Sequence, residues 1–512
     1  MGIIWKANGS FHEDAKERGE SLWIQKEYLN QEDQQILERQ QLKGDVQTEV
    51  AVIGGGIAGI LTAYLLQERG ISVVVLECAG IGSGMTKGTT AKISSQHGLI
   101  YRKLLTYKGE MRAREYAAIN QYSIEKYEDM IQQLRIDCDF QRLPNYIYTL
   151  DNDLKIKQEV EAAKRLGLPA VYTKDTNLPF PVKSAIRFDH QAQFHPLKFL
   201  RAVAGRLSVY EHVRIKEMRT DGLIITEQGT VKAKSVVIAT HYPFINAPGY
   251  YFLRMHQERH YLAALEGSGK ELMGMYLDAD PQGFTFRNYQ DYLILGSGGH
   301  RTGQFHPKDA YARIEMAAKQ WYPQARIKYI WSAADCITPD SVPYIGRFSV
   351  NTPNFYVATG FNKWGMTGSM SAAIILRDMI MGNVNANRKV FNPRRFMLSG
   401  SKVMVEDAAI SASNLAAGML RIPHDKLRQI GRGQAGVIHY NGQRLGVYRD
   451  LNNKYYYVNT KCPHLGCSLE WNPNELSWDC PCHGSRFDYR GKWLNNPAMR
   501  DCLPSCLHDE KK

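Results

Sequence analysis

The sequence lacks the long hydrophobic runs that membrane-spanning helices need. Its longest apolar run, residues 52–66, is shorter than a bilayer span and is interrupted by glycines. The opening residues, MGIIWKANGS, have only a few apolar residues before Lys6, which does not match a secretory signal peptide. Lys6 also stands where a myristoylation signal requires Ser or Thr. The sequence therefore predicts a cytoplasmic protein with no membrane span.

Long runs of charge of one sign are also absent. The chain has 64 Lys and Arg residues and 51 Asp and Glu residues, a formal net charge of +13 that is mild for 512 residues. No run of five or more basic residues occurs, so a solvated basic surface is favoured over a nucleic-acid site. Attraction of anionic substrates or of an acidic redox partner is compatible with this charge.

The composition is that of an ordinary globular protein. Hydrophobic residues make up 44% of the chain and charged residues 22%, which argues against long disorder or a fibrous protein. A chain of 512 residues is too long for one hydrophobic core, so the length favours two or more domains.

A glycine-rich turn marks a dinucleotide site near the start of the chain. The pattern predicts a strand at 49–53, a helix at 58–69 and a second strand at 73–76. Gly54, Gly56 and Gly59 form GxGxxG between the first strand and the helix, where a pyrophosphate can approach the helix N-terminus. Glu77 ends the second strand and is placed to accept hydrogen bonds from a ribose. This motif alone does not distinguish FAD from NAD.

Three later segments favour FAD over NAD, because they resemble a family of FAD proteins. IGSGMTKGTTAKISSQHG, VVIATHYPF, and ITPDSVPYIGR with the following FYVATGFNKWGMTGS resemble the D-amino-acid-oxidase-like FAD family, over about residues 45 to 385. The resemblance implies a helix that begins near Thr367 and points its positive end at the flavin. It also implies that FAD contacts Gly82, Thr86, Thr89, Thr90, Ile215 and, beside the isoalloxazine, Gly360, Lys363, Trp364, Gly365 and Met366.

No catalytic residue follows from these motifs. Lys363 and Lys92 are candidate neighbours of the flavin ring, and a solvated surface position explains either lysine equally well. His256 and His260 are four residues apart, but RMHQERHYLAAL alternates like a strand, which argues against a metal pair. If this segment is the central strand, Arg259 and Tyr261 could face the flavin, and core packing explains them as well.

A second cofactor motif lies near the end of the sequence. CPHLGC is followed by CPCHGS, and together they resemble the Rieske family over about residues 423 to 505. The resemblance implies a [2Fe-2S] cluster with Cys462 and Cys480 on one iron and His464 and His483 on the other. It also implies a disulfide between Cys467 and Cys482. A structural zinc is the alternative, disfavoured because zinc modules usually have CxxC and HxxxH spacing.

These motifs predict the fold class and the domains. We expect an α/β Rossmann-type FAD-binding domain with an α+β substrate domain, followed by a small all-β Rieske domain. The predicted boundaries are an N-terminal extension at 1–48, the oxidoreductase domain at 49–384, a linker at 385–422 and the Rieske domain at 423–512. Within the oxidoreductase domain, the FAD-binding segments are 49–100, 210–245 and 335–384, with the substrate region between them.

The two cofactors together predict an oxidoreductase in which the flavin accepts two electrons at once and the [2Fe-2S] cluster carries one electron at a time. A small amine or amino-acid-like substrate would give hydride to the flavin, and the cluster would pass electrons to an external acceptor protein. Two alternatives are a reductase fed by an external donor and a Rieske domain that only senses redox state or supports the structure. A Rieske oxygenase would need a mononuclear iron with two His and a carboxylate, and no convincing set occurs.

Phe487 generates a prediction about the cluster potential. In high-potential Rieske proteins a Ser and a Tyr hydroxyl donate to the cluster sulfurs; Ser485 fills the first position and Phe487 replaces the Tyr. We expect Phe487→Tyr to raise the midpoint potential, because an added donor favours the reduced cluster. Redox titration of both proteins checks this, and an unchanged potential would contradict it.

Overall fold

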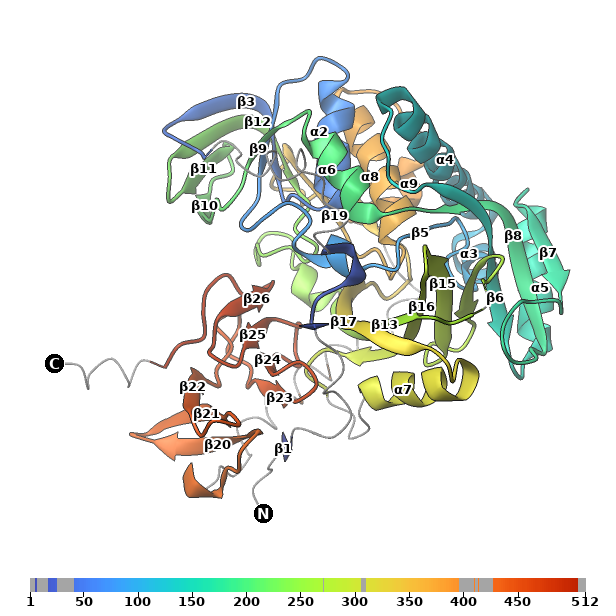
Figure 1. Ribbon diagram of the computed structural model, residues 1–512. Helices are drawn as coiled ribbons and strands as arrows, with labels where there is room; N and C mark the ends of the chain where they lie inside the picture. Colours follow the sequence, from blue (N-terminus) through green and yellow to red (C-terminus); the bar gives the residue numbers. More distant parts are fainter. Residues whose placement is uncertain are drawn as a thin grey trace.

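The computed structural model describes residues 5–6, 17–24, 41–269, 271–304, 310–395, 409, 413 and 427–504 (Figure 1). Residues 41–395 form a large domain and residues 427–504 form a C-terminal domain. Most of the predicted linker, 385–422, lies outside the described residues. None of the described helices is long and apolar enough to cross a bilayer.

The first layer of the large domain is an eight-stranded sheet. The predicted strand–helix–strand unit is present, as β3 (Val46–Ile53), α2 (Ile57–Gln67) and β4 (Val73–Leu76), with β3 and β4 parallel. The inner residues of β3 are buried, as expected for a parallel strand covered on both faces. The other strands are β9 (Ser208–Tyr210), β10 (Ile215–Met218), β11 (Leu223–Thr226), β12 (Thr230–Ile238), β18 (Tyr344–Arg347) and β19 (Phe355–Thr359).

Helices cover this sheet and connect it to the second one. The buried helix α8 (Gly365–Ile380) packs against α2 in the main core of the domain. The remaining helices of the domain are α3 (Ile100–Lys108), α4 (Glu110–Leu134), α5 (Asp153–Arg165), α6 (Pro196–Ala204), α7 (Ala310–Trp321) and α9 (Arg388–Phe391).

The second layer is a ten-stranded mixed sheet in the order β2-β17-β13-β16-β15-β14-β6-β8-β5, with β7 beside β8. Next to the edge strand β2, the long strands β17 (Arg326–Ile337), β13 (His256–Glu266) and β16 (Tyr292–Arg301) run antiparallel to their neighbours in this group. The others are β2 (Glu17–Arg18), β5 (Lys92–Ile93), β6 (Gln141–Thr149), β7 (Ala170–Thr173), β8 (Ser184–Gln193), β14 (Met275–Asp278) and β15 (Phe284–Tyr289).

The C-terminal domain is all β, as the sequence predicts. One sheet contains β20 (Gln434–Tyr440), β21 (Gln443–Arg449) and β22 (Tyr455–Asn459), and β1 (Trp5–Lys6) pairs with β20 at its edge. The other contains β23 (Glu470–Asn472), β24 (Ser477–Asp479), β25 (Arg486–Asp488) and β26 (Trp493–Asn495). Trp471 and Trp478 fill the core that these sheets share with the cysteine loops.

Part of the predicted N-terminal extension is built into the large domain. β2 pairs with β17, and the short 3-10 helix η1 (Leu22–Ile24) follows it. Leu22 and Trp23 are completely buried in the main core, where the Trp23 indole donates to the Thr89 carbonyl at 2.7 Å. Leu22 and Trp23 therefore belong to the core of the large domain.

Strand β13 separates two environments because its side chains alternate between the two faces of the sheet. Glu258 lies opposite Asp335 of β17 on the face that continues into the main core of the large domain. Gln257 and Arg259 lie on the other face, toward the C-terminal domain. Tyr261 shares their face and is buried in a second core cluster of the large domain, where its ring lies 4.9 Å from that of Tyr311, so core packing explains it.

A buried ion network joins the two domains across that second face. Arg259 Nε lies 2.6 Å from Glu475 Oε2, and Glu475 also lies 2.9 Å from Arg486. Arg486 in turn pairs with the buried Asp479 at 2.9 Å. Burial opposes ionisation of Glu475, but the two arginines hold its pKa down, at about 2. Glu475 therefore compensates both arginines, and Arg486 has Asp479 as a second carboxylate partner.

Removal of the Glu475 carboxylate should lower the stability of the folded protein. We expect Glu475→Ala to lower the free energy of unfolding by about 3–5 kcal/mol, because it removes the carboxylate partner of the buried Arg259 guanidinium and one of the two partners of Arg486. Asp221→Ala, which breaks the exposed ion pair with Lys232, is the control and should cost no more than about 1 kcal/mol. Denaturant unfolding at pH 7 measures both, and equal small losses would contradict the assignment.

The same carboxylate gives a pH dependence. The pKa of Glu475 is about 2 in the folded protein, and an unfolded Glu titrates near about 4.3. Its contribution to stability is therefore fully present above about pH 5 and is lost as the pH falls toward about 2.

Candidate active site and metal centre

The glycine-rich turn has the close packing that its sequence predicts. A Cβ on Gly59 would lie 2.0 Å from the Gly54 carbonyl oxygen, and one on Gly54 would lie 2.5 Å from the Ala239 oxygen. Gly54 also has a φ of +111°, which other residues rarely adopt. The Glu77 carboxylate accepts hydrogen bonds from the Gly55 and Ala79 amides at 2.6 and 2.8 Å. The turn thus brings the glycines, the start of α2 and Glu77 together.

The threonine segment lies beside this turn. The Thr86 hydroxyl accepts a hydrogen bond from the Ile57 amide at 3.2 Å, at the first residue of α2. A Cβ on Gly56 would lie 3.5 Å from the same hydroxyl. The Thr90 carbonyl accepts from the buried Arg287 guanidinium at 2.6 Å. These contacts fit residues that line a bound phosphate and ribityl chain, which is the role proposed for them.

Two of the predicted contacts have a packing explanation. Gly82 has a φ of +71°, and its Cβ would lie 2.7 Å from Leu197 and Leu200, so its backbone and packing already require glycine. Ile215 is half-buried in β10 against the core of the first sheet. Val213, two residues earlier, is buried and donates its amide to the Glu77 carbonyl at 2.8 Å.

The predicted isoalloxazine loop, residues 360–366, lies at the end of β17. The Asn362 amide donates to the Cys336 carbonyl at 3.1 Å, and Asn362 Oδ1 accepts from the Thr338 amide at 2.8 Å. The Trp364 ring stacks on His97 with centroids 4.9 Å apart. Helix α8 begins at Gly365, two residues before the predicted Thr367. The loop therefore follows β19 of the first sheet, is hydrogen-bonded to the end of β17 of the second sheet and leads into α8.

Four ionisable side chains gather beside this loop on the face of β13 that looks into the large domain. Lys363 Nζ lies 3.0 Å from Glu258 Oε2, and His260 Nδ1 lies 3.5 Å from Asp335 Oδ2. Burial raises the pKa of Asp335 to about 6. Burial also opposes ionisation of Glu258, but His256 and Lys363 hold its pKa well below the usual range. The pKa of His260 is lowered far enough by burial to keep the ring neutral.

This acidic cluster combines one ionised carboxylate with one that is protonated at mildly acidic pH. Such a pair can bind an ammonium group and hold a proton. The sequence indicates Lys363 as a candidate but not Glu258 and Asp335, because these two carboxylates come together only through the pairing of β13 with β17.

Lys92 lies elsewhere on the same sheet, in β5. Its Nζ donates to the Tyr276 carbonyl at 2.7 Å and to the Thr285 hydroxyl, and burial lowers its pKa well below the usual value. The solvated surface position considered for Lys92 is therefore wrong. Lys363, at 34% side-chain exposure, is partly accessible and ion-paired.

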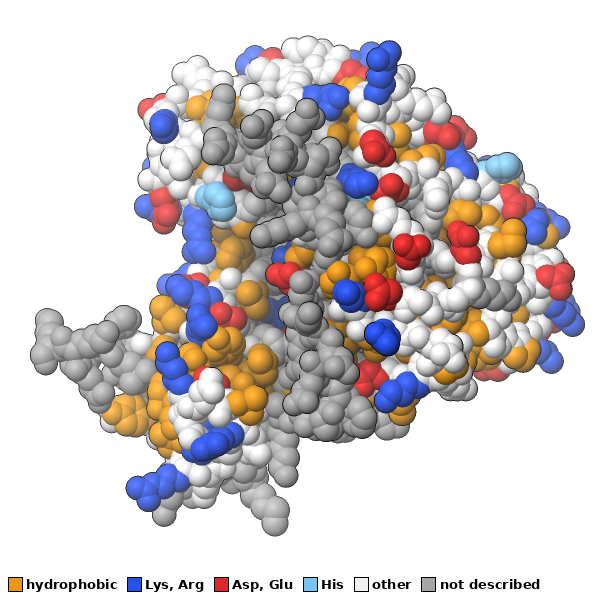
Figure 2. Space-filling model, in the orientation of Figure 1, with side chains coloured by type: hydrophobic (Ala, Val, Ile, Leu, Met, Phe, Trp, Pro, Cys, Tyr) orange, Lys and Arg blue, Asp and Glu red, His pale blue; other side chains and the backbone are white. Residues whose placement is uncertain are grey.

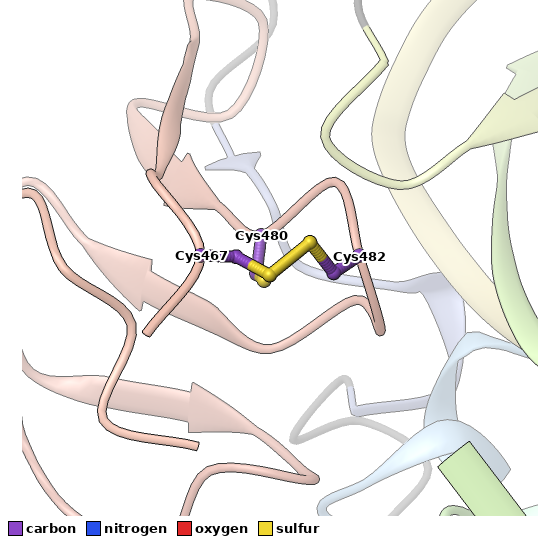
Figure 3. A group of neighbouring side chains, drawn as sticks. All are labelled: Cys467, Cys480 and Cys482. Atoms are coloured by element: carbon purple, nitrogen blue, oxygen red, sulfur yellow. A yellow bond between two sulfur atoms is a disulfide. The ribbon is translucent and has the colours of Figure 1, made fainter. Parts of the chain in front are cut away.

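In the C-terminal domain, two loops bring six predicted side chains together. Cys467 and Cys482 form a disulfide, and Cys480 lies beside it with its sulfur within 4.8 Å of both others (Figure 3). Cys462 and Cys480 are buried and free. A hydrogen bond from the Cys480 thiol lowers the pKa of Cys462, and the Ser485 hydroxyl acts in the same direction. The free thiols are the two expected as metal ligands.

The two histidines complete this set. The rings of His464 and His483 lie 5.0 Å apart, and the Nδ1 atom of each is buried without a hydrogen-bond partner among the described residues. His464 Nε2 lies 2.6 Å from Asn246 Oδ1. Burial lowers the pKa of His464 to about 4 and that of His483 to about 3, so both rings are neutral. Two neutral imidazoles with unsatisfied Nδ1 atoms and two thiols fit a Rieske cluster.

Comparison with known proteins agrees with both sites. The family of FAD dependent oxidoreductases matches residues 49–379, and the Rieske [2Fe-2S] domain matches residues 421–506. The chain belongs to the FAD dependent oxidoreductase family and carries a C-terminal Rieske domain. Its large domain binds FAD and its C-terminal domain binds a [2Fe-2S] cluster.

Individual relatives cover either the whole chain or its large domain. A Bacillus subtilis protein named as a Rieske 2Fe-2S iron-sulfur protein, YhfW, is 34% identical over 90% of this chain and 93% of its own length. Gamma-glutamylputrescine oxidoreductase of Escherichia coli is 22% identical over 71% of this chain and 90% of its own. L-proline dehydrogenase from P. horikoshii shares the fold, with a TM-score of 0.58 at 19% identity over 69% of this chain and 98% of that chain.

Glycine oxidase from Geobacillus kaustophilus has a TM-score of 0.57 at 16% identity, over 69% of this chain and 100% of that chain. L-proline dehydrogenase and glycine oxidase both resemble this chain in the fold of its large domain.

The proposed ligand set can be tested by comparing two buried thiols. We expect Cys462→Ala to abolish cluster incorporation while FAD is retained, because one iron loses a thiolate. Cys502→Ala is the matched control, since Cys502 is equally buried but donates its thiol to the Asn459 carbonyl. Iron and acid-labile sulfide analysis per chain measures the outcome. A full cluster in Cys462→Ala, or its loss in both variants, would contradict the assignment.

Proposed function

We propose that this protein is a dehydrogenase that oxidises a small amine or amino-acid-like substrate and passes the electrons through its Rieske domain to an external acceptor. The flavin supplies a hydride acceptor and the [2Fe-2S] cluster supplies a one-electron carrier. The observation that carries the proposal is the orientation of the two cluster histidines toward the large domain.

Three side chains of the large domain contact the histidines. Asn246 bonds to His464 Nε2, and the Gln257 side-chain amide donates to the His483 carbonyl at 2.9 Å. The Phe252 ring contacts both imidazoles edge-on, with centroids 6.1 and 5.6 Å away. With Nδ1 reserved for iron, His464 Nε2–H donates to Asn246, which fixes the ring orientation. This arrangement favours electron exchange between the domains over a separate sensing module.

A short route across two paired strands connects the two sites. Asn362 of the proposed isoalloxazine loop donates to the carbonyl of Cys336, and Cys336 pairs with Gln257 across β17 and β13. The Gln257 side chain is 1% exposed and reaches His483. A Cβ on Gly484 would lie 2.7 Å from Gln257, so the glycine permits this approach. Two adjacent strands thus separate the loop from a cluster ligand.

The acidic cluster supports an amine substrate. Glu258 is held ionised beside the proposed flavin loop, where it can orient a substrate ammonium group, and Asp335 can accept the proton that an amine must lose before oxidation. The names of three relatives, gamma-glutamylputrescine oxidoreductase, L-proline dehydrogenase and glycine oxidase, refer to amines or amino acids. The substrate class is inferred from these two lines together.

Anaerobic reduction tests the function. The purified protein is mixed with a panel of amines and amino acids while flavin absorbance and the low-temperature EPR signal of the cluster are recorded. We expect one substrate to bleach the flavin and the Rieske signal to follow. If dithionite produces the signal but a substrate that bleaches the flavin never does, internal transfer is absent and the proposal fails.

Gln257 provides a specific test of the route. We expect Gln257→Met to slow the appearance of the Rieske signal after flavin reduction, because the contact with His483 is lost while side-chain volume is retained. Gln67→Met is the control, since Gln67 also donates to a distant backbone carbonyl but lies on the surface. Stopped-flow absorbance measures the rates at equal cluster content. Equal rates in both variants would remove Gln257 from the route.

A further inference from the structure

The C-terminal domain carries its exposed charge with one sign. In the described residues 427–504, every exposed Lys, Arg, Asp or Glu residue is Lys or Arg, whereas each Asp and Glu is at least half-buried. Exposed hydrophobic side chains occur on the same domain, including Leu465 and Leu503 at 43% and 45% exposure. In Figure 2, Lys and Arg side chains lie beside hydrophobic ones on the visible face of this domain.

Several of these residues lie on the cluster loops or on the segment beside them. Lys461 precedes Cys462 and Leu465 follows His464, so both flank proposed cluster ligands. The Cys502 thiol lies 3.4 Å from the Lys461 carbonyl, which places Arg500 and Leu503 on the segment beside that loop. Lys492 pairs with Asp501 of the same segment at 2.8 Å.

The surface continues onto the large domain. The exposed Arg214 stacks its guanidinium over the Trp493 ring at 5.5 Å from the centroid. We call the six residues Lys461, Leu465, Lys492, Arg500, Leu503 and Arg214 the basic–apolar patch.

We propose that the basic–apolar patch docks an acidic one-electron carrier protein, which is the external acceptor. This inference rests on the proposed function. It specifies the external acceptor, which the proposed function does not identify. Each two-electron oxidation of substrate reduces two molecules of a one-electron carrier, and the protons go to solvent. The basic side chains of the patch attract an acidic partner by long-range electrostatics. The exposed leucines offer that partner an apolar contact area, and transient protein interfaces combine both features.

The two sides of the cluster loops then have different roles. The histidine rings contact Asn246 and Phe252 of the large domain, so the large domain covers the histidine side of the cluster loops. Lys461 and Leu465 remain exposed on the same loop. An electron therefore enters from the large domain and leaves through the patch. An anionic membrane would also be attracted to basic side chains, but it offers no redox centre next to the cluster.

Binding of a model acceptor tests the patch independently of turnover. The probe is reduced plastocyanin, a small acidic blue-copper protein, titrated into the intact holoprotein by calorimetry at low and high ionic strength. We expect binding that weakens with salt. Lys461→Gln combined with Arg500→Gln should weaken it about tenfold, because two basic charges of the patch are removed.

The matched control removes the same charge elsewhere on the domain. Lys454 and Arg432 are exposed basic residues at the opposite end of β22 from Lys461, and Lys454→Gln with Arg432→Gln should leave binding within about twofold. Equal weakening in both double variants would show a general charge effect and overturn the patch. Tighter binding of basic cytochrome c, or of phosphatidylserine vesicles, than of plastocyanin would overturn the acidic protein partner.

Electron transfer gives a second measurement. Reoxidation of the cluster by oxidised plastocyanin should slow in the Lys461/Arg500 variant and stay unchanged in the Lys454/Arg432 variant, at equal cluster potential. Reduction of the cluster by substrate should be the same in both. Failure of that reduction would contradict the proposed function, whereas unchanged plastocyanin binding and reoxidation would contradict the patch alone.

Discussion

The arrangement of the two redox sites depends on the buried carboxylate of Glu475. It compensates Arg259 from the large domain and Arg486 from the C-terminal domain, and neither arginine is solvated. A buried ion pair of this kind contributes little net stability compared with an apolar contact, but it penalises every arrangement in which one partner is left unpaired. The network therefore selects one position of the C-terminal domain on β13, and the contacts of Gln257 and Asn246 with the cluster histidines follow from that position.

The alternation of side chains along β13 gives one strand two roles. Glu258 and His260 face the loop proposed to hold the isoalloxazine, and Gln257 and Arg259 face the C-terminal domain. A shift of one residue in register would exchange the two sets and place Arg259 in the acidic cluster. The long pairing of β13 with both β16 and β17 holds this register, so the sheet positions the proposed substrate site and the cluster contacts together.

The sequence predicts the features that depend on neighbouring residues. The glycine turn, the strand β4 and the two cysteine–histidine loops are each encoded by a few adjacent side chains, and the fold class is confirmed. Strand β3 begins at Val46 rather than Glu49, because its exposed first residues are held by pairing with β12, which local hydrophobicity does not report. The contacts of Glu258 with Lys363 and of Gln257 with His483 join distant segments, so no local pattern predicts them.

The central claim is that the cluster is held with its histidines against the large domain. Anomalous scattering at the iron edge in crystals of the holoprotein tests it most directly, because it locates both irons relative to the protein. The account predicts one iron at the Nδ1 atoms of His464 and His483, with Asn246 against the first ring and Gln257 at the His483 carbonyl. Iron bound by another set of side chains, or a C-terminal domain detached from β13, would contradict it.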